Sequence, residues 1–223
     1  MKFEKYNSNL SYSYVFGAFG TIEMLTSKKS ECIAVLVDPS FVNNEAFNKI
    51  KDLCKNSKIQ IIIDKKVLDK IKDKGNIYVI GVFKKYQHKL SNNQHILLSN
   101  VNDVGVIGTI IRSMRGFNFE NLVLLNCNVD IYHEHLIRST MGAIFKTNVL
   151  KYNSLKEYKK DYPENLLVNI TSKGNDLSTL KISNNITLIF NETTNEEEFK
   201  NINMNQDISL ENIVNIVLFT LYK

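Results

Sequence analysis

The feature that most constrains this chain is a regular alternation of short apolar runs with amphipathic stretches. In the front half, the patterns predict strands at Cys32–Asp38, Gln60–Ile63 and Asn76–Phe83. Helical spacing is found at Ala18–Ser27, Asn43–Cys54 and Asp64–Lys72. Asp64 is suited to cap the last of these helices, and Gly75 to stop it. Strands that alternate with helices favour an α/β fold with a mostly parallel sheet.

A polar and charged segment, Lys84–Gln94, interrupts the alternation and is typical of a linker. Beyond it the pattern restarts, with predicted strands at His95–Ser99, Asn121–Leu125, Leu166–Ile170 and Ile186–Phe190. Predicted helices lie near Gly105–Phe117, Glu134–Met141, Ser154–Lys160 and Leu210–Tyr222. The sequence therefore predicts two α/β domains, residues 1–88 and 94–223.

Charge is distributed unevenly between the two halves. Residues 1–92 contain 16 lysines, no arginine and 9 acidic residues, a net charge of +7. Residues 93–223 contain 9 lysines, 3 arginines and 14 acidic residues, a net charge of −2. A lysine-rich domain beside a near-neutral one suggests contact with a polyanion. Alternatively, and equally compatible with the charge, the lysines form a solvated surface of a lysine- and asparagine-rich chain.

Several functional classes are disfavoured by the composition. No apolar run approaches the ~18 to 20 residues of a membrane span, and the N-terminus lacks a secretory signal pattern. Three widely spaced cysteines fit free thiols in a reducing cytoplasm better than disulfides. No zinc-ligand spacing accompanies them, and His133, Glu134 and His135 are too close together for a helical metal site. We therefore expect a cytoplasmic protein without a bound metal.

The segment "NDVGVIGTIIRSMRGF" contains the most distinctive residue pattern. On a helix, Gly105, Gly108, Arg112 and Arg115 share one stripe, and Ile107, Ile110, Ile111, Met114 and Phe117 form an apolar one. A guanidinium beside a gap in side chains suits a phosphate. Helix packing on the glycines, with both arginines in solvent, explains the same pattern. The spacing fits neither a dinucleotide fingerprint nor a Walker motif.

Three longer segments carry a family resemblance. "LLSNVNDVGVIGTIIRSMRGFNFENLVLL", "VDIYHEHLIRSTMGAIFKTNV" and "INMNQDISLENIVNIVLFTLY" resemble successive motifs of the SpoU/TrmH RNA 2′-O-methyltransferases of the SPOUT superfamily. In the second segment, Arg138, Ser139, Met141, Gly142, Ala143 and Phe145 follow the family order. The front half, through "YVFGAFGTIEML" and "KGNIYVIGVF", is similar to the family's substrate-binding domain.

The resemblance implies a fold and an activity. The fold would be an N-terminal ribosomal-protein-like α/β/α domain that binds RNA, followed by a C-terminal α/β SPOUT domain with a trefoil knot. The activity would be methyl transfer from S-adenosylmethionine to a ribose 2′-hydroxyl in rRNA or tRNA. A homodimer through the C-terminal domain would complete the active site.

The resemblance also assigns site residues. Arg112 would orient the reacting ribose and its phosphate, and Asn212 would lie near the transferred methyl group, although Glu211 fits that position by another alignment. The expected cofactor-binding residues are Phe190, Asn191, Glu192, Ile202, Met204 and Leu210, acting largely through backbone groups.

Several residues depart from the family motifs. Val106 replaces an asparagine, Val104 and Asn203 replace prolines, and Phe190 and Thr193 replace the glycines that flank Asn191 and Glu192. A side chain at those glycine positions adds a Cβ where the backbone approaches the cofactor. The segment between Glu192 and Ile202 is also short. A degenerate homologue that binds RNA or acts as a dimeric scaffold, without catalysis, is therefore the alternative to an enzyme.

Aromatic residues near the N-terminus have two interpretations. Tyr12, Tyr14 and Phe16 could stack on RNA bases or belong to the hydrophobic core.

Overall fold

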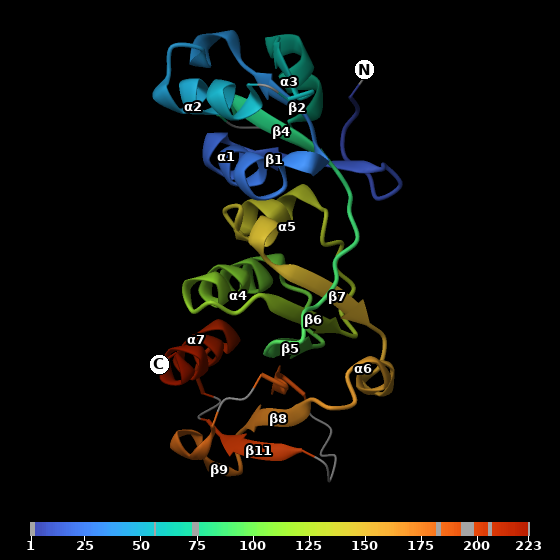
Figure 1. The fold of residues 1–223 in the computed structure, drawn as a ribbon, viewed down its shortest axis with the longest axis vertical. Helices are drawn as coiled ribbons and strands as arrows, with labels where there is room; N and C mark the ends of the chain where they lie inside the picture. Colours follow the sequence, from blue (N-terminus) through green and yellow to red (C-terminus); the bar gives the residue numbers. More distant parts are fainter. Residues whose placement is uncertain are drawn as a thin grey trace. The chain divides into compact units, whose positions relative to one another are not determined.

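The computed structural model describes residues 3–55, 57–72, 76–181, 184–192, 199–204 and 207–222. The chain divides into two compact units, whose elements are labelled in Figure 1. Unit 1 comprises Met1–Gln87 and Asp130–Phe145, and unit 2 comprises His88–Val129 and Lys146–Lys223. The division into residues 1–88 and 94–223 stays a prediction; the compact unit 1 also includes Asp130–Phe145, and unit 2 begins at His88.

Unit 1 is built on a four-stranded sheet in the order β1-β4-β2-β3. The strands are β1 (Tyr12–Phe16), β2 (Cys32–Val37), β3 (Gln60–Ile63) and β4 (Val79–Lys84). The helices of its first 87 residues are α1 (Ala18–Ser27), α2 (Glu45–Cys54) and α3 (Lys65–Ile71), with short 3₁₀ turns η1 (Lys29–Glu31) and η2 (Pro39–Phe41). Among the described strand pairs of this sheet, β2 and β3 are parallel, whereas β4 runs antiparallel to both β1 and β2, so the expectation of a mostly parallel sheet is wrong for unit 1.

Alternating side chains build two hydrophobic clusters in unit 1. Val15, Val35 and Phe83 contribute to a cluster with Met24 and Leu25 of α1 and with residues of α2. The neighbouring strand residues Tyr14, Leu36 and Val82 belong to a second cluster, with Leu68 and Ile71 of α3. Because successive residues of a strand point to opposite faces, the sheet lies between helices on both sides. The predicted α/β/α arrangement of this part is consistent with these contacts.

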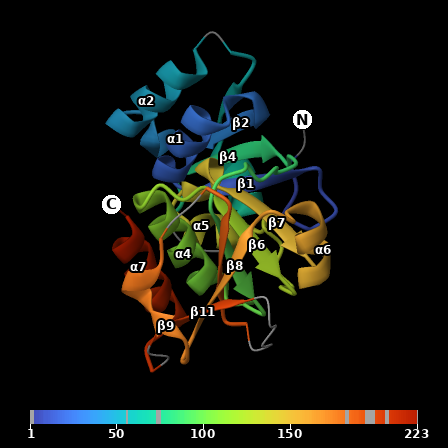
Figure 2. The same cartoon turned by 60° about the horizontal axis from the view of Figure 1, so that its bottom comes forward.

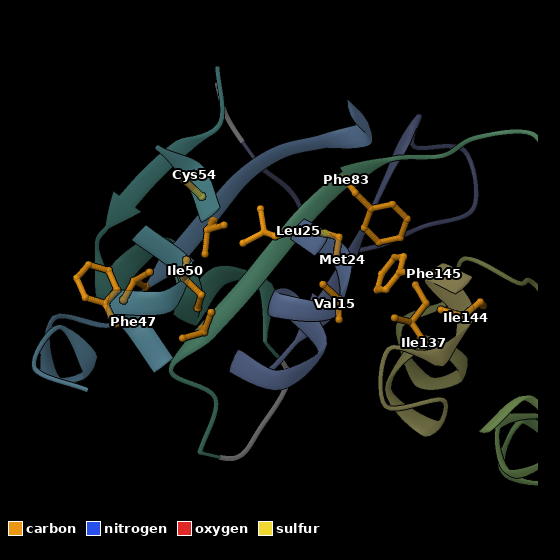
Figure 3. Packing of buried hydrophobic residues seen from close by; sticks show 13 residues of the cluster. Val15, Met24, Leu25, Phe47, Ile50, Cys54, Phe83, Ile137, Ile144 and Phe145 are labelled. Carbon is orange, nitrogen blue, oxygen red and sulfur yellow. The ribbon is translucent and has the colours of Figure 1, made fainter. Parts of the chain in front are cut away.

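The segment Asp130–Phe145 completes the first cluster. It contains α5 (Glu134–Ser139) and begins the 3₁₀ turn η3 (Ala143–Lys146). Figure 3 shows Ile137 and Phe145 directed toward Val15, Met24 and Phe83, and Ile144 belongs to the same cluster; the rings of Phe83 and Phe145 lie 5.1 Å apart edge to face. α5 ends earlier than predicted because Met141 and Gly142 have positive φ, at 50° and 85°.

Unit 2 contains a seven-stranded sheet in the order β7-β6-β5-β10-β8-β11-β9, and all six strand pairs are parallel. The strands are β5 (His95–Ser99), β6 (Asn121–Leu125), β7 (Asn148–Tyr152), β8 (Leu166–Thr171), β9 (Asn175–Asp176), β10 (Ile186–Phe190) and β11 (Lys200–Asn203). The helices are α4 (Val104–Gly116), α6 (Leu155–Asp161) and α7 (Leu210–Leu221), with a 3₁₀ turn η4 (Leu177–Thr179).

Burial explains why the central strands read as continuous apolar runs. Every residue of β5, β6 and β10 is buried, as expected for parallel strands covered on both faces. α4 buries the predicted stripe Ile107, Ile110, Ile111 and Met114, and Asp103 caps its first turn. α4 and α7 lie side by side in both views of unit 2 (Figures 1 and 2).

The predicted elements match the structure closely where their local signals are strong. β3, β5, β6 and β10 begin and end as predicted, and Asp64 caps α3. The strands β1, β7, β9 and β11 were not predicted. Gly75 and most of the acidic run at 191–199 lie outside the described residues. Among the helices described, none is long and apolar enough to cross a membrane.

Candidate functional site at the carboxyl edge of the unit 2 sheet

The ends of the parallel strands of unit 2 bring the predicted cofactor residues to one edge of the sheet. Since the strands run in the same direction, their last residues lie along the same edge, where open α/β sheets bind ligands. Asn191 and Glu192 follow β10, and Met204 follows β11. The N–H group of Met204 donates to the carbonyl oxygen of Thr171 at the end of β8 (2.8 Å). We call this the carboxyl edge.

Three neighbouring strands, β6, β5 and β10, are each followed by an asparagine in the left-handed backbone region. The φ angles of Asn126, Asn100 and Asn191 are 51°, 57° and 61°. Asparagine adopts this conformation more readily than other residues with a Cβ, because its short amide can bond locally. Each strand therefore ends in an abrupt turn, and exposed amide side chains stand at the carboxyl edge.

Ser99, the last residue of β5, holds the loop after β10. Its hydroxyl group donates to Oε2 of Glu192 (2.7 Å), and its carbonyl oxygen accepts from Nδ2 of Asn191 (2.9 Å). The hydroxyl oxygen of Ser99 also accepts from Nδ2 of Asn100 (2.9 Å), and Nδ2 of Asn126 donates to Oδ1 of Asn100. A connected row of polar groups therefore fixes the carboxylate of Glu192.

Two of the predicted cofactor residues have side chains in the core. Phe190 is 1% exposed and pairs with Leu98 and Ile170, while Ile202 is fully buried. The phenyl group of Phe190 therefore points into the hydrophobic interior, while its Cβ stands where the family motif has a glycine, and the effect of that Cβ on cofactor binding stays a prediction. Phe190 and Ile202 can offer a ligand only their main-chain groups. Thr193, the other replaced glycine, lies outside the described residues.

The start of α7 carries the remaining predicted residues. Leu210 begins the helix after Ser209, and the N–H groups of Asn212 and Ile213 both donate to the carbonyl oxygen of Ser209 (3.0 Å each). Asn212 is exposed, and Glu211 is half-buried. The amide of Asn212 is therefore more accessible to a ligand than the side chain of Glu211.

The two arginines of α4 differ in their surroundings. Arg115 forms an ion pair with Glu120 (3.1 Å) and its side chain is 25% exposed. Arg112 is exposed, and its guanidinium donates to the hydroxyl group of Thr109 (3.2 Å). Arg115 thus links α4 to the residue before β6, whereas Arg112 lies on the accessible surface of the helix.

A second polar cluster lies at the opposite edge of the same sheet. The fully buried His95 has its Nε2 2.9 Å from the carbonyl oxygen of Ser91 and its Nδ1 2.7 Å from the hydroxyl group of Tyr158, which also contacts Thr187. A carbonyl only accepts, so Nε2 carries the proton and the neutral ring accepts at Nδ1. Burial lowers the pKa of His95 and raises that of Tyr158 to about 12. This cluster is closed to solvent and has a structural role.

Comparison with known proteins identifies the family. Residues 93–208 match the model of the SpoU rRNA Methylase family, which is just over half of the chain. The chain belongs to the SpoU family. No curated protein matches it in sequence.

Solved SpoU-type structures share the fold over nearly the whole chain. An rRNA methyltransferase from Sinorhizobium meliloti is 18% identical with a TM-score of 0.73, and covers 95% of this chain and 86% of its own. The SpoU methyltransferase AviRb from Streptomyces viridochromogenes, solved with AdoMet, is 16% identical with a TM-score of 0.75, covering 95% and 89%. A putative RNA methyltransferase of the TrmH family from Porphyromonas gingivalis is 14% identical, with a TM-score of 0.74 and the same coverage. Because the sequence identities are this low, the similarity to these structures shows the fold alone.

The SpoU motif in the second segment has a packing role in this chain. Phe145 and Gly142 lie in unit 1, where a Cβ on Gly142 would stand 2.7 Å from Cβ of Glu23. Only glycine fits both that close approach and the positive φ. Val106, at the position of the SpoU asparagine, is half-buried in the first turn of α4, and its N–H group donates to Asp103 (3.0 Å).

Other residues singled out from the sequence have structural surroundings. Nδ1 of His133 accepts from the N–H group of His135 (3.2 Å) at the start of α5. Within the described ranges, no group of three histidine, cysteine or acidic side chains could hold a metal ion. Tyr14 is fully buried and cannot stack on a base, whereas Tyr12 and Phe16 are half-buried.

The sequence reasoning missed Ser99, Asn100 and Asn126. Each stands at the end of a predicted buried strand or directly after it, and polar residues at that place in a parallel sheet are a usable signal. The partner of Ser99, however, is Glu192, 93 residues away in the sequence, so no local pattern indicates their contact.

Proposed function

We propose that this chain transfers a methyl group from S-adenosylmethionine to a ribose 2′-hydroxyl in rRNA or tRNA. The observation that carries the proposal is the position of Glu192. In a chain of the SpoU family, its carboxylate is held at the carboxyl edge by Ser99 (2.7 Å), beside the exposed Asn191.

The groups at this edge fit the chemistry of the cofactor. S-adenosylmethionine carries a cationic sulfonium, an ammonium group and ribose hydroxyls, which carboxylate and amide oxygens can bind. Glu192 and Asn191 supply such oxygens, and Phe190, Ile202, Met204 and Leu210 would contribute main-chain groups. When bound, the cofactor supplies an electrophilic methyl group.

Arg112 is suited to bind the RNA. Its exposed guanidinium, one of whose donors is given to Thr109, is a planar group suited to bind a backbone phosphate and the oxygen of the 2′-hydroxyl. A guanidinium carries only donors and no acceptor atom, so it cannot take up the hydroxyl proton. We therefore assign Arg112 to orienting the ribose, so that its oxygen approaches the methyl group in line. With the cofactor bound, the sulfonium would supply the methyl group and leave as a neutral thioether, and the hydroxyl proton would pass to solvent.

Asn212 is our choice for the residue near the methyl group. Its exposure in the first turn of α7 supports it over Glu211, which is half-buried. The amide can orient the reacting oxygen without carrying a charge.

We propose that residues 1–88 bind RNA and that residues 94–223 form the catalytic SPOUT domain. Sixteen lysines in residues 1–92 would contact backbone phosphates without reading sequence. In the catalytic domain, β10 lies between β5 and β8 while β11 pairs beyond β8, an order compatible with the trefoil knot expected of the family. Three free cysteines support a cytoplasmic location.

A homodimer through α4 and α7 is part of the proposal. Phe219 is 70% exposed, and Ile216 and Tyr222 are also exposed. With Ser113, Phe117 and Asn215, Ile216 and Phe219 line a groove of about 470 Å³. Oδ1 of Asn215 is buried, with no hydrogen-bond partner among the described residues. A second copy would cover the apolar surface and offer a donor to Asn215.

The degenerate scaffold remains the second candidate because of Val106. A valine cannot make the hydrogen bonds of the asparagine that the family places before the arginine of α4. In this alternative the chain would bind RNA and dimerise without binding the cofactor.

Titration calorimetry of the purified chain with S-adenosylmethionine distinguishes the two candidates. The enzyme should release or absorb measurable heat with a single-site isotherm at millimolar cofactor or below. Transfer of a labelled methyl group to rRNA or tRNA, followed by nuclease digestion, should then yield a 2′-O-methylated nucleotide. Absence of binding would support the scaffold, and a base-methylated product would refute ribose specificity.

A further inference from the structure

The polar row at the carboxyl edge has a direction. Starting from Asn126, each amide or hydroxyl hydrogen is donated to the next group, through Asn100 (2.9 Å to Ser99) and Ser99 (2.7 Å), until the row ends on the carboxylate of Glu192. Hydrogen bonds that share donors and acceptors in one direction polarise each other. The last bond, to an ionised acceptor, is the strongest kind in the row.

Ser99 occupies the central place in this row. It is 1% exposed, and it contacts the loop after β10 twice, through its hydroxyl group to Glu192 and through its carbonyl oxygen to Asn191. A serine hydroxyl has one hydrogen, and here that hydrogen is given to Glu192 while the oxygen accepts from Asn100. The orientation of the hydroxyl group is therefore fixed from both sides.

We propose that Ser99 is a positioning residue for Glu192, and that it tunes cofactor affinity through that carboxylate. This inference rests on the proposed function, which assigns Glu192 to the cofactor site. Asn191 turns the chain through a left-handed conformation (φ 61°), and both bonds to Ser99 act on this turn and the residue after it. Without the hydroxyl group, the carboxylate of Glu192 loses its hydrogen bond to β5 and is held less firmly in this orientation.

A purely structural role for Ser99 makes a different prediction. In that case, removal of the hydroxyl group would lower the melting temperature and leave cofactor affinity unchanged. Ser91 provides a matched control, because its hydroxyl group also bonds an amide side chain, that of Asn121 (2.9 Å), in front of the same strand β5. It belongs to the opposite edge of the sheet.

The experiment is cofactor titration by calorimetry on the full chain and on Ser99→Ala, Glu192→Ala, the double variant and Ser91→Ala, each with a thermal melt. We expect Ser99→Ala to weaken binding by about tenfold or more, the loss expected for a hydrogen bond to a charged group, and Ser91→Ala to bind as the unaltered chain does. In the Glu192→Ala background, Ser99→Ala should have no further effect, because its effect acts through Glu192.

Three results would overturn the inference. These are unchanged affinity of Ser99→Ala, an equal loss in Ser91→Ala, and independent losses in the double variant. If Ser99→Ala does not fold, Asn126→Ala, at the exposed start of the row, should weaken binding in the same direction, and unchanged affinity there would overturn it too. A chain that binds no cofactor before any substitution removes the proposed function and this inference together. If the unaltered chain binds the cofactor and the variants bind it with the same affinity, only the inference about Ser99 fails.

Discussion

The hydroxyl group of Tyr132 bonds the main chain of Tyr86 in both directions. It accepts from the N–H group of Tyr86 (3.1 Å) and donates to the carbonyl oxygen of the same residue. Tyr86 follows β4 and Tyr132 precedes α5, so one side chain joins the end of the first sheet to the segment Asp130–Phe145 within unit 1. The two rings are also in edge contact, with centroids 5.8 Å apart.

Tyr132→Phe should destabilise unit 1 by about 1 to 3 kcal/mol, because it leaves two main-chain groups of Tyr86 without this partner while keeping the ring. Urea unfolding followed by circular dichroism measures the change. The control is Tyr78→Phe, at a side chain that is 42% exposed and stacks on Phe41. Equal stability of the two variants would show that the bonds between Tyr86 and Tyr132 contribute little.

Acid should destabilise unit 2 through His95. Burial lowers the pKa of this histidine in the folded state, while in the unfolded state its pKa is about 6.5. Below about pH 6.5 the unfolded chain binds a proton that the folded chain does not, so stability falls as the pH decreases through this range. Unfolding free energies at pH 7.5 and 5.5 test this, and His95→Gln should reduce the difference. An unchanged difference would exclude His95 as its source.

Arg112→Ala should lower methyl transfer by at least about a hundredfold while leaving cofactor affinity nearly unchanged, because the side chain is assigned to the RNA and not to the cofactor. Arg112→Lys should restore little activity, since an ammonium lacks the planar pair of donors. Single-turnover assays with labelled cofactor give the rate, and calorimetry gives the affinity. Turnover at the original rate would remove Arg112 from the mechanism.

Phe219→Glu should convert the proposed dimer to a monomer, because it places a charge on the exposed apolar surface of α7. Sedimentation velocity measures the mass. Phe19→Glu serves as the control, because Phe19 is similarly exposed, at 60%, but belongs to unit 1. If Phe219→Glu keeps the mass of the unaltered chain, the surface formed by α4 and α7 is not the interface.

Local patterns were sufficient for elements whose signals lie within a few residues. Asp64 caps α3 by accepting from the N–H group of Lys66 (2.8 Å), and β5 and β6 are each built on a short apolar run. By contrast, β11 has one buried apolar residue, Ile202, between polar neighbours, and its strand conformation depends on pairing with β8. β7 similarly mixes polar and apolar residues and pairs only with β6 among the described strands.

The sequence by itself determined the α/β alternation, the family, and the residues expected to act, because periodicity, caps and motifs are short-range properties of the chain. Only the tertiary structure decided that Phe190 is buried, that Asp130–Phe145 packs within unit 1, and that Ser99 holds Glu192 (2.7 Å). The order of strands in a sheet depends on contacts between distant segments. Ser99 and Glu192 meet because β5 and β10 are neighbours in the sheet, a pairing that neither residue encodes locally.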